Sequence, residues 1–344
     1  MNDFKIRASF VMRTIASLFL IVNCSGKDSS SFHHHLQSGP VPWTDNKFDS
    51  SGDKFTFALF SDLNGGEREK VFEVAMEQLS LLRPEFIISL GDLIDGGTEN
   101  RETLTNEWDF FDQRASATLA HVFYVGGNHD LTNLTMRKVW EERYGAQYYH
   151  FVYRKILFLI LDSEDYSNKR MREIYLARAD YLNKRKSMTL EQVQKMEYMN
   201  IPERRTGEIG SEQSEYFLNA LADHPDVEWT FLFMHKPVWL RDDESDFSAI
   251  ESALSNRPYT LFNGHFHSYS HTVRHGRDYI MLGTTGGGQN INDPMSFDHV
   301  TLVTMTEDGP SIASLKLNGI LDKTGRIPAG GDSLCLQASN CGNG

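Results

Sequence analysis

Apolar residues in this chain occur in short runs, and each run ends in a few polar residues. Six runs are rich in β-branched and aromatic side chains, at residues 55–60, 86–90, 121–125, 156–161, 229–234 and 259–262. Their length and composition predict buried strands. Between several of them, apolar residues recur three or four positions apart, as in residues 71–82, which predicts amphipathic helices. This alternation of strands and helices favours a largely parallel sheet covered by helices.

The pattern changes after residue 264, where shorter strands are predicted at residues 268–274, 279–282, 299–304 and 311–317. This part of the chain is expected to be antiparallel. We therefore predict an α/β fold, a four-layer sandwich of mixed β-sheets flanked by helices. One folded domain is expected at residues 53–320, followed by a C-terminal tail at residues 321–344.

Residues 165–208 interrupt the alternation and predict a helical insertion with a net positive charge. They contain ten Lys or Arg residues and seven Asp or Glu residues, in a chain whose net charge is −13. Two interpretations stay open at this point. The insertion is either a basic cap that meets an anionic substrate or a solvated helical segment.

The composition is that of a soluble globular protein, with 40% hydrophobic and 24% charged residues among 344. The acidic net charge argues against a protein that coats nucleic acid through charge, so no nucleic-acid partner is expected. Cys335 and Cys341 lie close together near the C-terminus, and their spacing leaves open whether they pair. Both are far in sequence from the motifs described below, which argues against thiol catalysis.

The first residues have the pattern of an export signal. Lys5, Arg7 and Arg13 precede an apolar stretch at residues 14–22. A basic start followed by a short apolar stretch is typical of a secretory signal, and the stretch is too short for a convincing membrane span. We therefore predict a signal peptide at residues 1–23.

Residues 21–24 resemble a bacterial lipobox, in which the cysteine, here Cys24, becomes the lipidated first residue. Asn23 departs from that pattern, because a small residue is usual at its position. The alternative is an ordinary cleaved signal with an unmodified cysteine. The lipobox interpretation predicts an extracytoplasmic protein that is held to a bacterial membrane, in the periplasm or at the cell surface. Residues 24–52, which are rich in Ser and His, are then expected to form a flexible tether.

Side chains that bind metals follow five of the six predicted strands. They are Asp62, Asp92, Asn128, His235, His265 and His267, and His129 and Asp130 lie beside Asn128. The carboxyl ends of parallel strands meet at one crevice, so these side chains are expected to lie together there. Any one of them alone is better explained as a helix cap or an ordinary surface residue, but the ordered set predicts a metal site. Mixed oxygen and imidazole donors suit Mn, Fe or Zn rather than calcium.

These ordered motifs resemble those of the calcineurin-like metallophosphoesterase superfamily, over roughly residues 55–290. The stretch at residues 207–239 is similar to the branch that contains purple acid phosphatases and cyclic-nucleotide phosphodiesterases. The resemblance implies an enzyme that binds two divalent or trivalent transition-metal ions, and the signal-like residues 1–23 make it an exported one. Its substrate would be a phosphomonoester or a phosphodiester, attacked by a hydroxide that the two metals activate.

The resemblance also implies a role for each residue. Asp92 would bridge the two ions, Asp62 and His267 would hold the first, and Asn128, His235 and His265 would hold the second. His129 matches the family's catalytic histidine and would protonate the leaving oxygen or stabilise its charge. Asp130 is either the residue that orients His129 or a helix cap.

Asn64 departs from the family pattern, which usually has histidine there as a ligand of the first metal. An amide oxygen is a weaker donor than imidazole, so affinity at the first site is in doubt. Asn64 is kept as a candidate ligand. The alternative function is a non-catalytic or single-metal binding protein whose first site this substitution has weakened.

Two further segments have open interpretations. The glycine-rich residues 283–288 either present backbone N–H groups to a phosphate or form a tight turn between strands. Residues 162–164 follow a strand where the insertion begins, and they either line the pocket or cap a helix.

Overall fold

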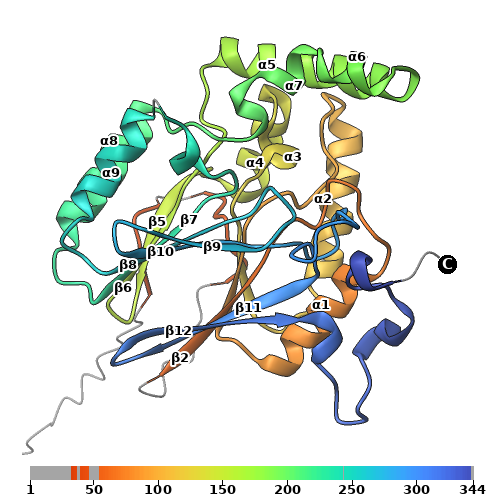
Figure 1. The fold of residues 1–344 in the computed structure, drawn as a ribbon. Helices are drawn as coiled ribbons and strands as arrows, with labels where there is room; N and C mark the ends of the chain where they lie inside the picture. Colours follow the sequence, from red (N-terminus) through yellow and green to blue (C-terminus); the bar gives the residue numbers. More distant parts are fainter. Residues whose placement is uncertain (1–31, 37–38, 46–53, 243, 342–344) are drawn as a thin grey trace, which may run out of the picture.

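The computed structural model describes residues 32–36, 39–45, 54–242 and 244–341 (Figure 1). Its strands are β1 (Phe32–His34), β2 (Phe55–Phe60), β3 (Phe86–Ser89), β4 (His121–Phe123), β5 (Tyr149–Tyr153), β6 (Ile156–Ile160), β7 (Trp229–Phe233), β8 (Tyr259–Asn263), β9 (Ser270–Arg274), β10 (Arg277–Met281), β11 (His299–Thr306) and β12 (Gly309–Lys316). Its α-helices are α1 (Val71–Leu82), α2 (Arg101–Ala115), α3 (Asn128–Leu131), α4 (Leu134–Tyr144), α5 (Asn168–Lys184), α6 (Leu190–Gln194), α7 (Glu197–Asn200), α8 (Ser211–Asp223) and α9 (Ser245–Ala253).

The strands form two mixed sheets. The seven-stranded sheet has the order β1-β5-β6-β7-β8-β10-β9, and the five-stranded sheet has the order β12-β11-β2-β3-β4. Strands β6, β7, β8 and β10 are parallel to one another, as are β2, β3 and β4. Antiparallel strands complete both sheets at their edges. The predicted mixed α/β sandwich is confirmed.

The alternation of side chains within single strands explains the sandwich. In β2, Phe55, Phe57 and Leu59 point into the core between the two sheets, whereas Ala58 and Phe60 point to the core under the helices. In β6, Phe158 lies in the core between the sheets, and the leucines on either side of it face the opposite way. Because both faces of these strands are apolar, both must be covered, which produces four layers.

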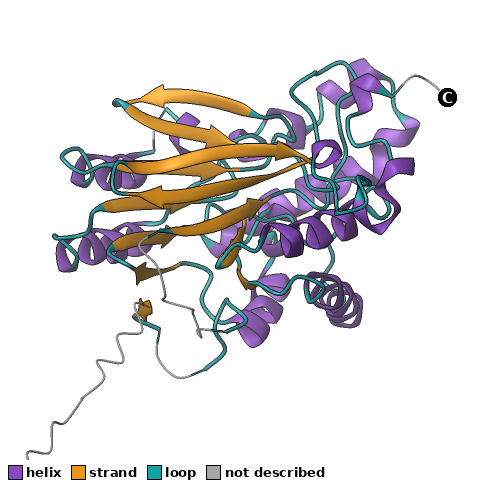
Figure 2. Ribbon diagram, turned by 90° about the horizontal axis from the view of Figure 1, so that it is seen from below, coloured by secondary structure: helices purple, strands orange, loops and turns teal. Residues whose placement is uncertain are grey.

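Helices cover the two outer faces (Figures 1 and 2). Phe72 of α1, Trp108 of α2 and Trp140 of α4 are fully buried against the five-stranded sheet. Phe217 of α8 and Ile250 of α9 are fully buried against the seven-stranded sheet. Helices α5, α6 and α7 lie apart from both layers, on the side of the molecule that also carries α3 (Figure 1).

Both ends of the described chain correct the predicted domain boundaries. Residues 32–45 lie in the segment predicted to be a tether, but Phe32 and Trp43 are buried and β1 pairs with β5. Residues 321–341 were predicted to be a tail, but the 3-10 helix η5 (Pro328–Ser333) packs against α1. Apolar side chains at both ends find buried surface on the domain, so the ends become part of it.

A disulfide joins Cys335 to Cys341, which settles the open question about this pair. The predicted antiparallel arrangement after residue 264 is correct for β9, β11 and β12, but β10 is parallel to β8. The predicted signal peptide at residues 1–23 and Cys24 lie outside the described residues. Within the described residues, every helix is too short or too polar to cross a membrane.

Candidate metal centre

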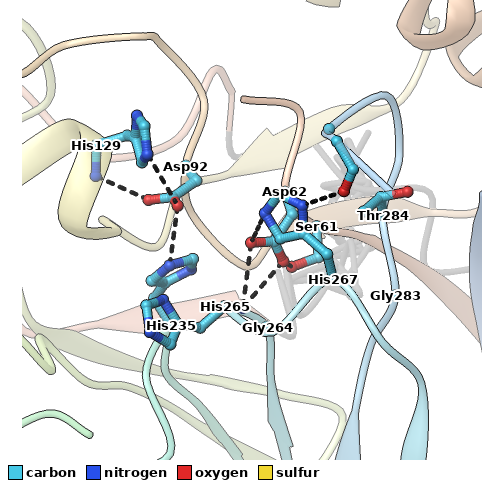
Figure 3. A network of polar contacts seen from close by, with 12 residues as sticks. Ser61, Asp62, Asp92, His129, His235, Gly264, His265, His267, Gly283 and Thr284 are labelled. Atoms are coloured by element: carbon cyan, nitrogen blue, oxygen red, sulfur yellow. Dashed lines mark hydrogen bonds and ion pairs between the residues drawn. The ribbon is translucent and has the colours of Figure 1, made fainter. Parts of the chain in front are cut away.

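The predicted ligands come from the ends of neighbouring strands in both sheets (Figure 3). Asp62 and Asp92 follow β2 and β3 of the five-stranded sheet. His235 follows β7 of the seven-stranded sheet, and His265 and His267 follow β8. The carboxyl ends of the parallel strands of the two packed sheets lie at the same edge of the sandwich, and these loops meet there.

Four of the predicted ligands have an uncommon backbone conformation. The φ angles are 52° at Asp62, 56° at Asp92, 83° at His265 and 55° at His267. Side chains with a Cβ avoid this left-handed region, at a cost of about 1–2 kcal/mol each. Such conformations persist where the surrounding fold imposes them, and they concentrate at functional sites. The turns therefore serve the placement of the ligand side chains.

The ligand atoms form two overlapping groups. Asp92, His235 and His265 offer donor atoms that all lie within 4.8 Å of one another, and so do Asp62, Asp92 and His267. Asp92 belongs to both groups. A carboxylate has two oxygens and can bind one cation with each, so this geometry has room for two ions that share Asp92.

Backbone carbonyls fix the orientation of the three imidazoles. The Nδ1 of His235 donates to the carbonyl of Leu90 (2.7 Å), and the Nδ1 of His267 donates to the carbonyl of Gly288 (2.5 Å). The Nε2 of His265 donates to the carbonyl of Arg204 (2.9 Å). In each ring the other nitrogen is left as an acceptor for a metal, which is the usual arrangement of metal-binding histidines.

Two buried ligand atoms have no hydrogen-bond partner among the described residues. They are the Oδ1 of Asn128 and the Nε2 of His235. An unpaired buried acceptor costs about 1–3 kcal/mol, so it is rare in a folded protein without a function. The Nε2 of His235 lies 3.2 Å from the Oδ2 of Asp92. A metal ion beside Asp92 would give the Nε2 of His235 a partner, and Asn128 lines the same cavity, so the residues present fit the predicted second site.

The charges of the site favour cation binding. Burial alone would raise the pKa of Asp92, but the charges of His235 and His129 and the backbone hydrogen bond from His129 hold it well below its usual range. Burial lowers the pKa of His235, and the larger effect of Asp92 raises it to about 10. Asp92 is therefore ionised, and a bound cation would take the place of a proton on His235.

The chain matches the family model of the calcineurin-like phosphoesterase over residues 55–269, more than half of its length. The chain belongs to the calcineurin-like phosphoesterase family. It is therefore a hydrolase that acts on phosphate esters, in a family that uses divalent metals. Among curated protein sequences there is no significant match.

The chain is similar in fold to one solved structure at a TM-score of 0.50 and more distantly similar to others. A dimetal phosphatase from Danio rerio is 16% identical, with a TM-score of 0.50, and the match covers 76% of this chain and 98% of that one. The anchor in the inner membrane complex of Plasmodium is 13% identical, with a TM-score of 0.49 and coverage of 80% and 87%. A purple acid phosphatase from yellow lupin is 11% identical, with a TM-score of 0.45 and coverage of 73% and 49%. At these identities the likeness is one of fold.

In this phosphoesterase, His129 lies beside the shared carboxylate. Its backbone N–H donates to the Oδ1 of Asp92 (2.8 Å), and its Nε2 is 3.9 Å from the Oδ2 of Asp92 (Figure 3). The Nδ1 donates to the backbone carbonyl of Asp95 (2.7 Å), and the Nη2 of Arg178 donates to the Nε2 (3.1 Å). The ring is thus held from one side with its Nε2 directed into the cavity.

Asp130 does not orient His129, which corrects one of the two interpretations of that residue. Its fully buried carboxylate accepts four backbone N–H groups, from Asp92 (2.8 Å), Leu93 (2.9 Å), Ile94 (3.2 Å) and Gly127 (2.8 Å). It caps α3 and joins the loop of Asp92 to the loop of Asn128. Burial and then the charge of Asp92 raise the pKa of Asp130 to about 7, against the effect of the N–H groups.

Asn64 is buried, with its side chain directed to the loop of Asp92. Its amide nitrogen donates to the carbonyl of Leu93 (3.1 Å). This bond ties the two ligand loops together. Its role as a metal ligand stays a prediction. Without it, the candidate ligands of the first site would be Asp62, Asp92 and His267, whereas Asn128 would join Asp92, His235 and His265 at the second.

The two segments with open interpretations are structural. The N–H groups of Thr285 and Gly287 donate to the carbonyl of Asp62 (3.4 and 2.8 Å), so the glycine-rich turn supports a ligand loop. Within residues 162–164, Asp162 pairs with Arg137 (2.7 Å) and Glu164 pairs with the buried Lys236 (2.7 Å). Neither segment lines the cavity at the metal centre.

A cavity of about 780 Å³ opens over the ligands, and the basic insertion forms one of its walls. The insertion contributes Arg178, Tyr181, Leu182, Arg185, Tyr198, Arg204 and Arg205. This location favours the interpretation of the insertion as a cap over the substrate site. The sequence revealed the positive charge of this segment, but not which of its residues face the metal centre, because that depends on how the helices dock.

Proposed function

We propose that this phosphoesterase hydrolyses a phosphomonoester or a phosphodiester at a centre of two transition-metal ions, Mn, Fe or Zn. The observation that carries the proposal is the pair of ligand groups that share Asp92 at the floor of a cavity. Asp62 and His267 would complete the first site, and Asn128, His235 and His265 the second. Ions held there would bind the phosphoryl oxygens and lower the pKa of the attacking water.

The chain itself supplies orientation and charge at the leaving group. His129 is held through its Nδ1, and its Nε2 faces the cavity beside Asp92. Once its Nε2 carries a proton and no longer accepts the hydrogen bond from Arg178, it can donate a hydrogen bond or that proton to the leaving oxygen. Arg178 places its guanidinium next to the Nε2 of His129. Its positive charge would stabilise the negative charge that develops on the leaving oxygen.

The test is metal analysis of residues 25–344, purified without a histidine tag, together with hydrolysis of p-nitrophenyl phosphate and bis-p-nitrophenyl phosphate with and without Mn²⁺. We expect two ions per chain and metal-dependent turnover, and the faster substrate identifies the preferred ester. One ion or none, with no turnover at millimolar Mn²⁺, would instead favour the binding-protein alternative that Asn64 raises.

We also propose that the enzyme is exported and held to a membrane through a lipid on Cys24. The basic and apolar pattern of residues 1–23 supports export, and the disulfide between Cys335 and Cys341 suits an oxidising compartment. Cys24→Ser should move the protein from the membrane fraction to the soluble fraction. Unchanged fractionation would refute anchoring through that residue.

A further inference from the structure

Four arginines of the insertion line the cavity without a carboxylate partner. They are Arg178, Arg185, Arg204 and Arg205. Among the described residues, no ion pair within 4.0 Å involves any of the four. Like charges gathered at one cavity wall repel one another, so an anion bound beside them would be favourable.

Other cations of the same insertion provide the contrast. Arg170 pairs with Glu203 (2.7 Å), Lys184 with Asp180 (2.5 Å) and Lys195 with Glu191 (2.6 Å). Lys169 and Arg172 also have acidic partners, at 3.9 and 3.8 Å. These five residues do not line the cavity. Of the six cations of the insertion that lie away from the cavity, five thus have an acidic partner and Lys186 has no ion pair within 4.0 Å to any described residue, whereas all four at the cavity lack one.

Arg178 is the clearest of the four, because only 8% of its surface is exposed. Its hydrogen bond from Nη2 goes to the neutral ring nitrogen of His129 rather than to a carboxylate. Its Nη1 would lie 2.6 Å from a Cβ at Gly97, so the glycine makes room for the guanidinium. A buried, permanently charged group without an anion is costly, and a substrate anion in the cavity would remove that cost.

The metal centre does not require these charges to bind the phosphate that is cleaved. Two divalent ions carry four positive charges, which Asp62, Asp92 and a phosphomonoester dianion would neutralise. Beyond the ligands, Asp95 is the one other carboxylate at the cavity among the described residues. The arginines thus leave an excess of about three positive charges for another anionic group.

Aromatic rings hold two of these guanidiniums in place. Arg185 lies over the ring of Tyr181 (5.4 Å to the centroid), and Arg205 lies over the ring of Phe266 (5.6 Å). Tyr181 also packs on Tyr198, with ring centroids 5.3 Å apart. The cation–π contacts limit the motion of long side chains and lower the entropy cost of binding an anion.

We propose that these four residues, the arginine cluster, form a second anion subsite, which binds a phosphate or carboxylate that the substrate carries in addition to the ester being cleaved. The inference rests on the proposed function and names its substrate class: phosphate esters whose leaving group is itself negatively charged. Arg185, Arg204 and Arg205 determine specificity, Arg178 also stands beside His129 at the leaving group, and the metal centre performs the cleavage.

The test compares phenyl phosphate with 4-carboxyphenyl phosphate and with 1,4-phenylene bisphosphate, by release of inorganic phosphate. The wild-type enzyme should prefer the two charged esters in kcat/KM by about tenfold or more, the value of one charge-assisted hydrogen bond. In Arg185→Gln/Arg205→Gln this ratio should fall to about one. The ratio compares two substrates of the same protein preparation, so a partial loss of folded enzyme lowers both values equally and leaves the ratio unchanged. A preference for one of the two charged esters identifies the second group as a carboxylate or a phosphate.

The matched control is Lys169→Gln/Lys195→Gln, which removes the same charge from the same insertion outside the cavity and should keep the wild-type ratio. Equal ratios in wild type and both variants would overturn the inference. If the wild type cleaves neither these monoesters nor the diester bis-p-nitrophenyl phosphate, the proposed function fails, and the subsite is tested separately by calorimetry with inorganic tripolyphosphate in EDTA. Binding that is at least tenfold weaker in Arg185→Gln/Arg205→Gln than in the control would still support the subsite, and equal binding would refute it.

Discussion

The carboxylate of Asp130 joins the loop of Asp92 to the loop of Asn128, and the substitution Asp130→Asn tests how much this connection stabilises the protein. The carboxylate is fully buried and accepts four backbone N–H groups, two at each oxygen. Asparagine has nearly the same shape but offers one acceptor oxygen. If that oxygen keeps the N–H groups of Leu93 and Ile94, the new amide nitrogen faces those of Asp92 and Gly127. Two donors then lose their acceptor and meet another donor.

The expected loss follows from the two broken bonds. A hydrogen bond to a charged group contributes about 1.5–3 kcal/mol, so losing two costs about 3–6 kcal/mol. The substitution also removes a buried charge, which offsets part of this cost. Because the raised pKa of Asp130 shows that its buried charge is itself costly beside Asp92, the net fall in the free energy of unfolding is smaller than the two bonds alone, about 1–2 kcal/mol.

Urea denaturation of the metal-free protein at pH 7.5 measures this loss. The matched control is Asp95→Asn, because the side chain of Asp95 is exposed and its contact with His129 is through the backbone carbonyl. The control should lie within about 0.5 kcal/mol of the wild type. If Asp130→Asn is as stable as Asp95→Asn, the carboxylate does not hold the two loops together and the reasoning fails.

Three further predictions concern the metals, the leaving group and acid stability. Asp92→Asn should abolish hydrolysis and lower metal content below two ions per chain, whereas turnover like the wild type's would refute a shared ligand. His129→Ala should keep both metals and lower kcat by about 10²–10⁴, and loss of metal in elemental analysis would show that His129 is a ligand. Burial lowers the pKa of His299 to about 4, and its Nε2 accepts the N–H of Gly283 (2.8 Å). Between about pH 6.5 and 4 the unfolded chain therefore binds a proton at His299 that the folded protein does not bind. The free energy of unfolding decreases as the pH is lowered through that window. His299→Gln should reduce the loss between pH 7 and pH 5 by about 2 kcal/mol, measured by urea denaturation, and an unchanged loss would contradict this assignment.

The local pattern of the sequence determined the layers of the fold and the position of the site. Residues 55–60 and 156–160 are apolar on both faces of their strands, so both faces must be covered. In both sheets one face packs against the other sheet and the opposite face packs under helices. The polar residues after five strands were predicted to meet because the carboxyl ends of parallel strands share an edge, and the structure brings Asp62, Asp92 and His267 together. These features depend on local periodicity and on a general rule of topology, so one sequence is enough to find them.

Other features depend on partners that are distant in sequence and leave no pattern in it. His129 is held by the carbonyl of Asp95, and a backbone carbonyl is present in every residue. Asp130 could have oriented a side chain or bound backbone, and only the approach of a second loop decided between them. The partner of Arg178 depends on how α5 docks beside the metal loops. Burial of Phe32 likewise depends on the pairing of β1 with the outer edge of β5. Local residue pattern determined the elements and the ligands, while long-range docking decided which groups orient them and which charges stay unpaired.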